Sequence, residues 1–270
     1  MITISHTITL LAPMSHGDPG PDLGNVTRFR RLPMVDATGQ VIHVPALSAG
    51  ALRGVVRRLL WREVFDRCGL GRDQMEAPKW DRLYAALANG GHIERAESRI
   101  SPDDIRARRA AMPVLSLLGA ALYGSHMAGR AQVSTSWLDC WETGKGGKPA
   151  ADYLADEHRV RHVDREEQEP EVSGVTPMPT TIETVITGAT LSGHARIGAA
   201  LEASAWCRGL DLVRYLGGKS GQGFGEVTVE HDGSAALYLA WLDENTDDLR
   251  ASLLALADEL GATTKTKKKK

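Results

Sequence analysis

The segment that follows Met1 constrains the fold most, because apolar and polar side chains alternate along it without interruption. In ITISHTITLL (residues 2–11), the isoleucines and Leu10 fall on one face, and Thr3, Ser5 and the later threonines fall on the other. A period of two predicts a half-buried β-strand. His6 lies on the apolar face, where a buried core histidine is expected rather than a catalytic one.

The rest of the chain repeats this pattern around two helical segments. Strands are predicted in GRAQVSTSWL (129–138), TLSGHARI (190–197) and GFGEVTVEH (223–231), and helices from Ser48 onward and over about 199–216. The order strand, helix, strand, strand, helix, strand predicts an α+β protein with a ferredoxin-like (RRM-like) βαββαβ core. Such a core has helices on one face of an antiparallel sheet, and its open face is a familiar platform for single-stranded nucleic acid.

The remaining segments are predicted to be insertions in a single domain spanning residues 1–270. Residues of about 69–113 are polar and helix-prone, and about 139–182 are rich in Gly, Pro and charge. An excursion of that length suggests a function of its own. Pro13–Pro45 is predicted to be loop-like, with a turn at DATGQ, and the lysine-rich end (262–270) is expected to be disordered.

The composition is that of a folded soluble chain, with 42% apolar and 24% charged residues. No apolar run approaches the length of a membrane helix, so a cytoplasmic protein without a membrane partner is expected. Cys68, Cys140 and Cys207 form no CxxC pair. They are therefore predicted to be buried thiols rather than a zinc site or a disulfide framework.

Positive charge is concentrated between Leu23 and Arg62, where seven arginines accompany the single acid Asp36. A basic region on an acidic protein is a candidate polyanion site, and a solvated helix face is an equally good explanation. On the helix after Ser48, Arg53 and Arg57 form one stripe beside the apolar face, and Arg58 and Arg62 form another.

The segment YLGGKSGQGFGEV (215–227) holds five glycines, at 217, 218, 221, 223 and 225. A P-loop needs a glycine five residues before its Gly-Lys pair, where this chain has Val213, and it follows a strand rather than a helix. The GxGxG spacing also departs from the dinucleotide fingerprint. Exposed backbone amides beside Lys219 instead predict a loop that binds the phosphates of a nucleic acid.

Four segments in register resemble a known superfamily. They are VPALSAGALRGVVRRLL (44–60), LLGAALYGSHMAGRAQVS (117–134), RVRHVDREEQEPEVSG with ETVITGATLSGHARI (159–174 and 183–197), and LGGKSGQGFGEV (216–227). They are similar to the "P-G-S-S-L-+-G-x-x-R" motif, the "LFG…GRVxVSD" block, the thumb insertion and the C-terminal glycine loop of the RAMP superfamily. The chain thus resembles the backbone ("Cas seven") subunits of class 1 CRISPR effector complexes, type IV-like or type III-like.

The resemblance implies a palm with a helical insertion and a thumb, in subunits that stack head-to-tail along a guide RNA (crRNA). Further copies, other effector subunits and a target DNA or RNA strand are the implied partners. Met178, between prolines, is the implied wedge between bases, although it could equally pack on its own protein. Phe224 could stack on a base or pack under a helix. The implied RNA-binding residues are Arg28, Arg30, Ser48, Arg53, Arg57, Lys219, Ser220, Gln222 and Phe224.

Whether the chain cuts RNA depends on the loop after the first strand. Type III relatives carry a catalytic Asp there, and in DLGNVTRFRR (22–31) the aligned position is Asn25, which favours a subunit that is not an enzyme. Asp18 and Asp22 keep a metal-dependent endoribonuclease open as an alternative. A divalent metal would be needed only in that case, and no cofactor or metal is otherwise expected.

Two weaker interpretations remain. His16 could act as an acid–base group, but a loop histidine is the simpler prediction because no second catalytic group lies at a recognisable spacing. A general single-strand RNA-binding protein is disfavoured, since aromatic residues make up only 5% of the chain.

Overall fold

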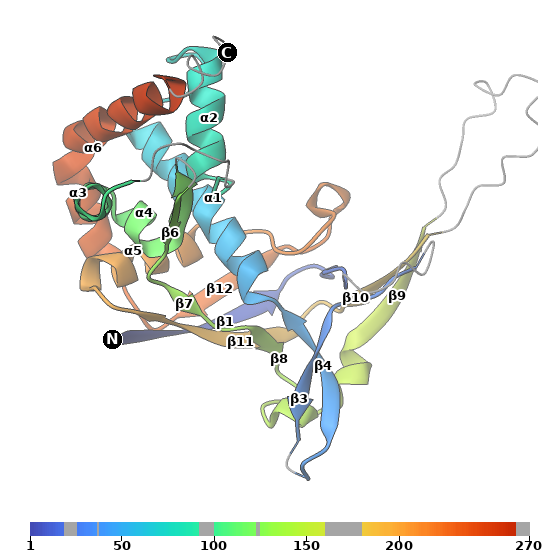
Figure 1. Ribbon diagram of the computed structural model, residues 1–270. Helices are drawn as coiled ribbons and strands as arrows, with labels where there is room; N and C mark the ends of the chain where they lie inside the picture. Colours follow the sequence, from blue (N-terminus) through green and yellow to red (C-terminus); the bar gives the residue numbers. More distant parts are fainter. Residues whose placement is uncertain (19–25, 37, 92–99, 123–124, 160–179, 263–270) are drawn as a thin grey trace, which may run out of the picture.

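The computed structural model describes residues 1–18, 26–36, 38–91, 100–122, 125–159 and 180–262 (Figure 1). Asp22, Asn25, Met178 and the lysine-rich residues 263–270 lie outside these ranges. The predictions made for them therefore stay predictions.

The central sheet has the strand order of the predicted core. Strands β12 (Val227–His231), β1 (Ile2–Leu10), β11 (Thr190–Ile197) and β8 (Ser136–Leu138) lie side by side in that order, and all neighbours are antiparallel. β7 (Gln132–Val133) pairs with the far end of β11. The α+β fold class is confirmed, because the first strand lies between the third and fourth strands of the motif, as in a split βαβ unit.

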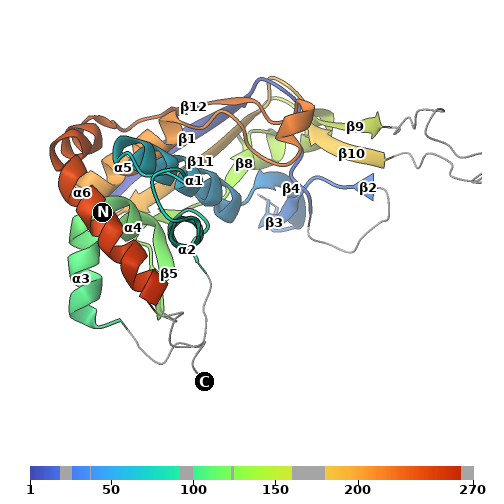
Figure 2. The same ribbon diagram turned by 90° about the horizontal axis from the view of Figure 1, so that it is seen from above.

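Two helices cover one face of this sheet (Figure 2). They are α1 (Ala49–Arg67), which precedes β7, and α5 (Ala200–Asp211), which follows β11. Ser48 caps α1 as predicted, since its side-chain oxygen accepts the Ala51 amide. The second helix was predicted to run to about residue 216 but ends at Asp211. Beyond it, the Leu216 amide donates to the Gly225 carbonyl, so the chain pairs with the start of β12 instead of continuing the helix.

The prediction of a loop over Pro13–Pro45 is wrong for its second half. Strands β3 (Arg31–Val35) and β4 (Val41–Leu47) form a hairpin around the predicted DATGQ turn, and β4 extends the central sheet by pairing with β8. The amides of Thr38 and Gln40 donate to the Asp36 carboxylate and close that turn. Only the second partner of β4, the strand β8, comes from residues far along the chain.

A helical lobe lies beyond α1 and α5 (Figure 1). It holds α2 (Ala77–Leu87), α3 (Pro102–Ala111), α4 (Pro113–Leu118) and the hairpin of β5 (Gly119–Leu122) and β6 (Ser125–Ala128). The long helix α6 (Ala236–Ala262), for which no prediction was made, packs against α2 and α5. Its Asp258 carboxylate forms an ion pair with the Lys79 ammonium at 2.9 Å. Leu242, Leu253 and other apolar residues of α6 are buried.

A second, smaller sheet projects away from the central one (Figures 1 and 2). Strand β10 (Thr180–Val185) pairs with β9 (Leu154–Arg159) and, in parallel, with the short β2 (Val26–Thr27). The single turns η1 (Trp141–Thr143) and η2 (Ala150–Tyr153) lead into β9. These strands form the described base of the predicted thumb, whose boundaries stay a prediction.

Two predictions from composition can be compared with the structure. Cys68, Cys140 and Cys207 are all buried free thiols, as expected. Of the helices described, none is both long enough and apolar enough to span a membrane.

Gly209 lies where α1 and α5 cross, and its lack of a side chain lets the two helices approach closely. A Cβ at Gly209 would lie 2.5 Å from Val56 Cγ1 and 3.1 Å from Leu60 Cδ1. We therefore expect Gly209→Ala to lower the free energy of unfolding by about 1–3 kcal/mol through overpacking. The matched control is Gly54→Ala on α1, where the nearest atom is an Arg58 nitrogen at 3.7 Å. The control should stabilise by about 0.5–1 kcal/mol. Equal effects in urea unfolding would contradict the close crossing.

His6 has the core position predicted for it and makes stability depend on pH. Its Nε2 lies 2.9 Å from Ser136 Oγ, and the side chain is buried beside Gly193. Burial, followed by the charges of His194 and His231, lowers the pKa of His6 from 6.5 to about 4, and only Asp232 opposes the shift. The folded state therefore binds fewer protons than the unfolded chain between these two values.

We accordingly expect the stabilisation linked to His6 to be complete above pH 6.5 and to be lost as the pH falls towards 4. The loss should amount to roughly 3 kcal/mol at most. Urea unfolding of the wild type and of His6→Gln across this range is the measurement, with His126→Gln as a control for substitution of an exposed histidine. If His6→Gln kept the full pH dependence, His6 would not be its source.

Candidate nucleic-acid interface

An extended segment after β1 joins three parts of the molecule. Ser15 bridges to Gly218 of the glycine loop, and Met14 bridges to Val185 at the end of β10. The Gly218 amide donates to the Ser15 carbonyl at 2.7 Å, and the Gly225 amide donates to the Pro13 carbonyl at 2.8 Å. Residues 13–18, called the seam below, therefore hold the glycine loop on one side and the projecting sheet on the other.

The glycines of the loop have different roles. Gly217 has φ 84°, and a Cβ there would lie 2.3 Å from the Ser15 carbonyl oxygen. A Cβ at Gly225 would lie 1.9 Å from the Leu216 carbonyl oxygen. Close backbone packing explains why both positions are glycine: Gly217 packs against the seam, and Gly225 packs against the segment that follows α5. Gly221, in contrast, has a normal φ and open space around it, so sterics do not explain it.

Lys219 has an unusual backbone conformation at the start of the exposed part of the loop. Among the described residues it is the one non-glycine with positive φ, at 61°. The single turn η4 (Ser220–Gln222) follows it. In the described part of the chain, no carbonyl accepts a hydrogen bond from the amides of Lys219, Ser220 or Gly221. A left-handed residue followed by a right-handed turn directs successive amides into one concavity, which is a common anion-binding geometry.

The base of the projecting hairpin contacts this loop through Arg159. Its Nη1 donates to Gln222 Oε1 at 2.9 Å, and its guanidinium lies 4.4 Å from the centroid of the Phe224 ring. Phe224 is only 3% exposed. The structure therefore has Phe224 packed under Arg159, and stacking on a base would require Arg159 to move. Sequence reasoning did not single out Arg159, although it opens the RVRHVDREEQ segment.

Ser48, His16 and Arg30 meet at the N-terminus of α1. The Ser48 amide donates to His16 Nε2 at 3.5 Å, and the Arg30 amide donates to the His16 carbonyl at 2.8 Å. Burial, and then the charge of Arg30, lower the pKa of His16. A neutral His16 that accepts this hydrogen bond fits the loop role predicted for it. The first turn of α1 carries no acidic residue.

Glu183 on β10 organises the basic residues that precede β4. Its carboxylate is 5% exposed and accepts the Phe29 amide at 2.8 Å. It also accepts hydrogen bonds from the guanidinium groups of Arg31 at 2.6 Å and Arg28 at 3.5 Å. Because a buried carboxylate needs partners, these contacts fix the start of β3 against the projecting sheet. The side chain of Arg28 remains half-exposed.

Arg53 and Arg57 point away from the glycine loop. Each donates through Nη2 to the Leu118 carbonyl at 2.6 Å, at the C-terminal end of α4. Burial lowers the pKa of both groups, and Arg53 adds to the effect at Arg57. Two half-buried cations on one helix end form a structural contact. A direct role for them in RNA binding stays a prediction, whereas Arg58 and Arg62 are exposed.

Asp18 lies at the end of the seam, on the surface. Its amide donates to the Arg28 carbonyl at 3.1 Å. Asp22 and Asn25, the other positions considered for RNA cleavage, lie outside the described residues. Within the part of the chain that is described, no group of three or more His, Cys, Asp or Glu side chains could hold a metal ion.

No protein-family model matches the sequence, and no curated protein matches it. Among solved structures, the chain is similar to one in a structure described as "Type IV-B CRISPR Complex". The TM-score is 0.59 at 20% identity, and the similarity covers 87% of this chain and 92% of that one. The two chains share a fold. The description names the kind of assembly that the sequence resemblance indicated.

The conformation of Lys219 leads to a prediction that separates folding from charge. A Lys held at φ 61° bears a steric cost of about 1 kcal/mol that glycine does not. Lys219→Gly should therefore leave the free energy of unfolding unchanged or raise it by up to about 1 kcal/mol. The control is Lys145→Gly, because Lys145 is also exposed but does not have a positive φ. That substitution should lower stability slightly. A clear loss of stability in Lys219→Gly would contradict the left-handed assignment.

Proposed function

We propose that this chain is a backbone subunit of a class 1 CRISPR effector complex. In this role it binds guide RNA along the phosphate backbone and assembles head-to-tail with further copies. The observation that carries the proposal is the fold that this chain shares, over 87% of its own length, with a chain in a structure described as "Type IV-B CRISPR Complex". Four sequence segments that resemble the RAMP backbone subunits support it independently.

The chemistry of the glycine loop supports binding to phosphates rather than to bases. Amides at Lys219, Ser220 and Gly221 together with the Lys219 ammonium supply positive potential. The seam places Arg28, Arg30 and Ser48 in the same region of the fold through its contacts with the glycine loop and with α1. Contacts of this kind bind any sequence, which a scaffold for arbitrary guides requires.

The projecting hairpin supports the thumb role. Strands β9 and β10 extend away from the central sheet (Figure 2), as a segment proposed to contact a neighbouring subunit or a nucleic-acid strand would require. Met178 remains the proposed wedge. Other effector subunits and a target DNA or RNA strand are proposed as further partners.

RNA cleavage is the weaker alternative. It rests on Asp18 with Asp22. Asn25, at the position aligned with the type III catalytic Asp, favours a binding and assembly role, for which we propose no cofactor.

The proposal predicts how the protein loads onto single-stranded RNA. With RNAs of increasing length, the mass of the purified complex should rise in steps of one 29.2 kDa subunit. RNA recovered after nuclease treatment should be protected at regular intervals. Native mass spectrometry or multi-angle light scattering measures the first quantity. A single copy bound at every length would contradict the backbone role.

Lys219→Gly provides the matched test of the binding loop, because it is expected to keep the fold. It should weaken RNA binding several-fold and lower the slope of log Kd against log salt by about one. Arg72→Gly, in the helical lobe, is the control for loss of a positive charge. Equal salt slopes for the two variants would show that the phosphates are bound elsewhere.

A further inference from the structure

The face of the central sheet opposite α1 and α5 carries a polar cavity. In Figure 2 these helices lie on one side of β12, β1, β11 and β8, which leaves the other side of these strands without a helical layer. A shallow cavity of about 460 Å³ lies over β1, β11 and the segment around β8. None of its lining residues belongs to the glycine loop or to the seam.

Strand register explains which side chains line this cavity. Thr3 faces Arg196, Ser5 faces His194 and Thr7 faces Ser192 across the β1–β11 pair. These are the alternate positions that do not point into the core, as the burial of Leu191, Ala195 and Ile197 between them confirms. The cavity is therefore built from a row of hydroxyl groups with a cation at its end.

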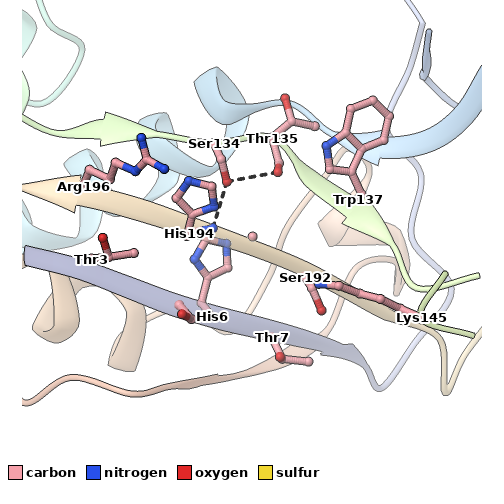
Figure 3. Close-up of a pocket in the computed structure, with 12 residues that line it drawn as sticks. Thr3, His6, Thr7, Ser134, Thr135, Trp137, Lys145, Ser192, His194 and Arg196 are labelled. Carbon is pink, nitrogen blue, oxygen red and sulfur yellow. Dashed lines mark hydrogen bonds between the residues drawn. The ribbon is translucent and has the colours of Figure 1, made fainter. Parts of the chain in front are cut away.

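An aromatic ring and a second cation complete the cavity at the other end. Trp137 on β8 pairs with Ser192 and is half-buried. Lys145, from the turn after η1, also lines the cavity. Figure 3 shows Arg196 at one end, Trp137 and Lys145 at the other, and His194 between them. Arg196 and Ser192 are four positions apart on β11, a span of roughly 13 Å at the usual strand rise.

The two cations have no protein partner among the residues described. No carboxylate there lies within ion-pair distance of Arg196 or Lys145. Among the acids of the sheet, Asp139 accepts hydrogen bonds from the hydroxyls of Thr190 and Ser192, and Glu230 on β12 pairs with Thr7. The cavity thus offers separated cations, hydroxyls and one ring.

We propose that this open face is a second nucleic-acid site, which binds a short stretch of single strand. Trp137 offers a stacking surface for a base, and Arg196 and Lys145 bind the flanking phosphates. Stacking on an aromatic ring beside a basic groove is how proteins bind single strands without sequence preference. The hydroxyl of Thr7 can donate a hydrogen bond to sugar or base, whereas the Ser192 hydroxyl donates to Asp139 and can only accept one. A site of this kind would let one subunit hold a second strand apart from the strand at the glycine loop.

The test separates this site from the glycine loop. Full-length protein is first saturated with unlabelled single-stranded RNA of guide length. Fluorescent single-stranded DNA and RNA hexanucleotides are then titrated at several salt concentrations. Arg196→Glu should weaken hexanucleotide binding at least tenfold and lower its salt slope by about one, with guide loading unchanged. Arg72→Glu, an exposed arginine of the helical lobe, should bind as the wild type does.

Lys219→Gly should show the opposite pattern, with weaker guide loading and unchanged hexanucleotide binding. Photocrosslinking of a 5-iodouracil hexanucleotide to wild-type protein should place the adduct on the peptides that contain Trp137 or His194. This localisation does not depend on how a Trp137 variant folds.

Three results would overturn the proposal. One is equal hexanucleotide binding by Arg196→Glu and Arg72→Glu, and another is crosslinks that map outside the cavity. The third is loss of self-association in Arg196→Glu with hexanucleotide binding intact, which would make the face a protein contact. If guide RNA failed to load at all, the proposed function would fall, while the same titration on free protein would still decide the second site.

Discussion

The seam at residues 13–18 is the contact on which the arrangement of the molecule depends. Its backbone pairs with the glycine loop at Ser15–Gly218 and with β10 at Met14–Val185, so it joins the central sheet to the projecting one. The approach is close enough that a Cβ at Gly217 would lie 2.3 Å from a seam carbonyl. Backbone contacts at this distance tolerate no side chain. Packing against the seam therefore sets the shape of the loop proposed to bind phosphates, and Arg159 holds its Gln222 side chain.

Buried charge organises the rest of the interface. Glu183 binds the Phe29 amide and two arginines, and the helix-end carbonyl of Leu118 binds Arg53 and Arg57. Charges removed from water need such partners, so each of these groups fixes the junction of two elements. The arginine-rich stretch consequently divides in two. Arg53 and Arg57 join helices, whereas Arg28 and the exposed Arg58 and Arg62 keep free surface.

Local patterns predicted the core well because its strands and helices have complete periodicities of their own. The alternation in residues 2–11 and 190–197 and the helix capped by Ser48 all appear where expected. The β3–β4 hairpin was missed because Pro33 and Pro45 stand inside its two strands, and proline is typical of loops rather than of strands. Helix α6 was missed as well. Its buried residues Tyr238, Leu242, Leu249, Leu253 and Leu256 recur at helical spacing, so the signal for this helix was present in the sequence.

The sequence by itself determined the fold class, the cap of α1, the burial of His6 and the three thiols, and the glycine loop as a special backbone segment. These follow from periodicity, residue chemistry and glycine content, which act over a few residues. Only the tertiary structure decided which charges are free. Arg57 and Lys219 carry the same charge in the sequence, but Arg57 donates to the Leu118 carbonyl, whereas Lys219 begins a run of three amides that no carbonyl of the described residues accepts. That difference depends on partners brought together by folding, which no local pattern encodes.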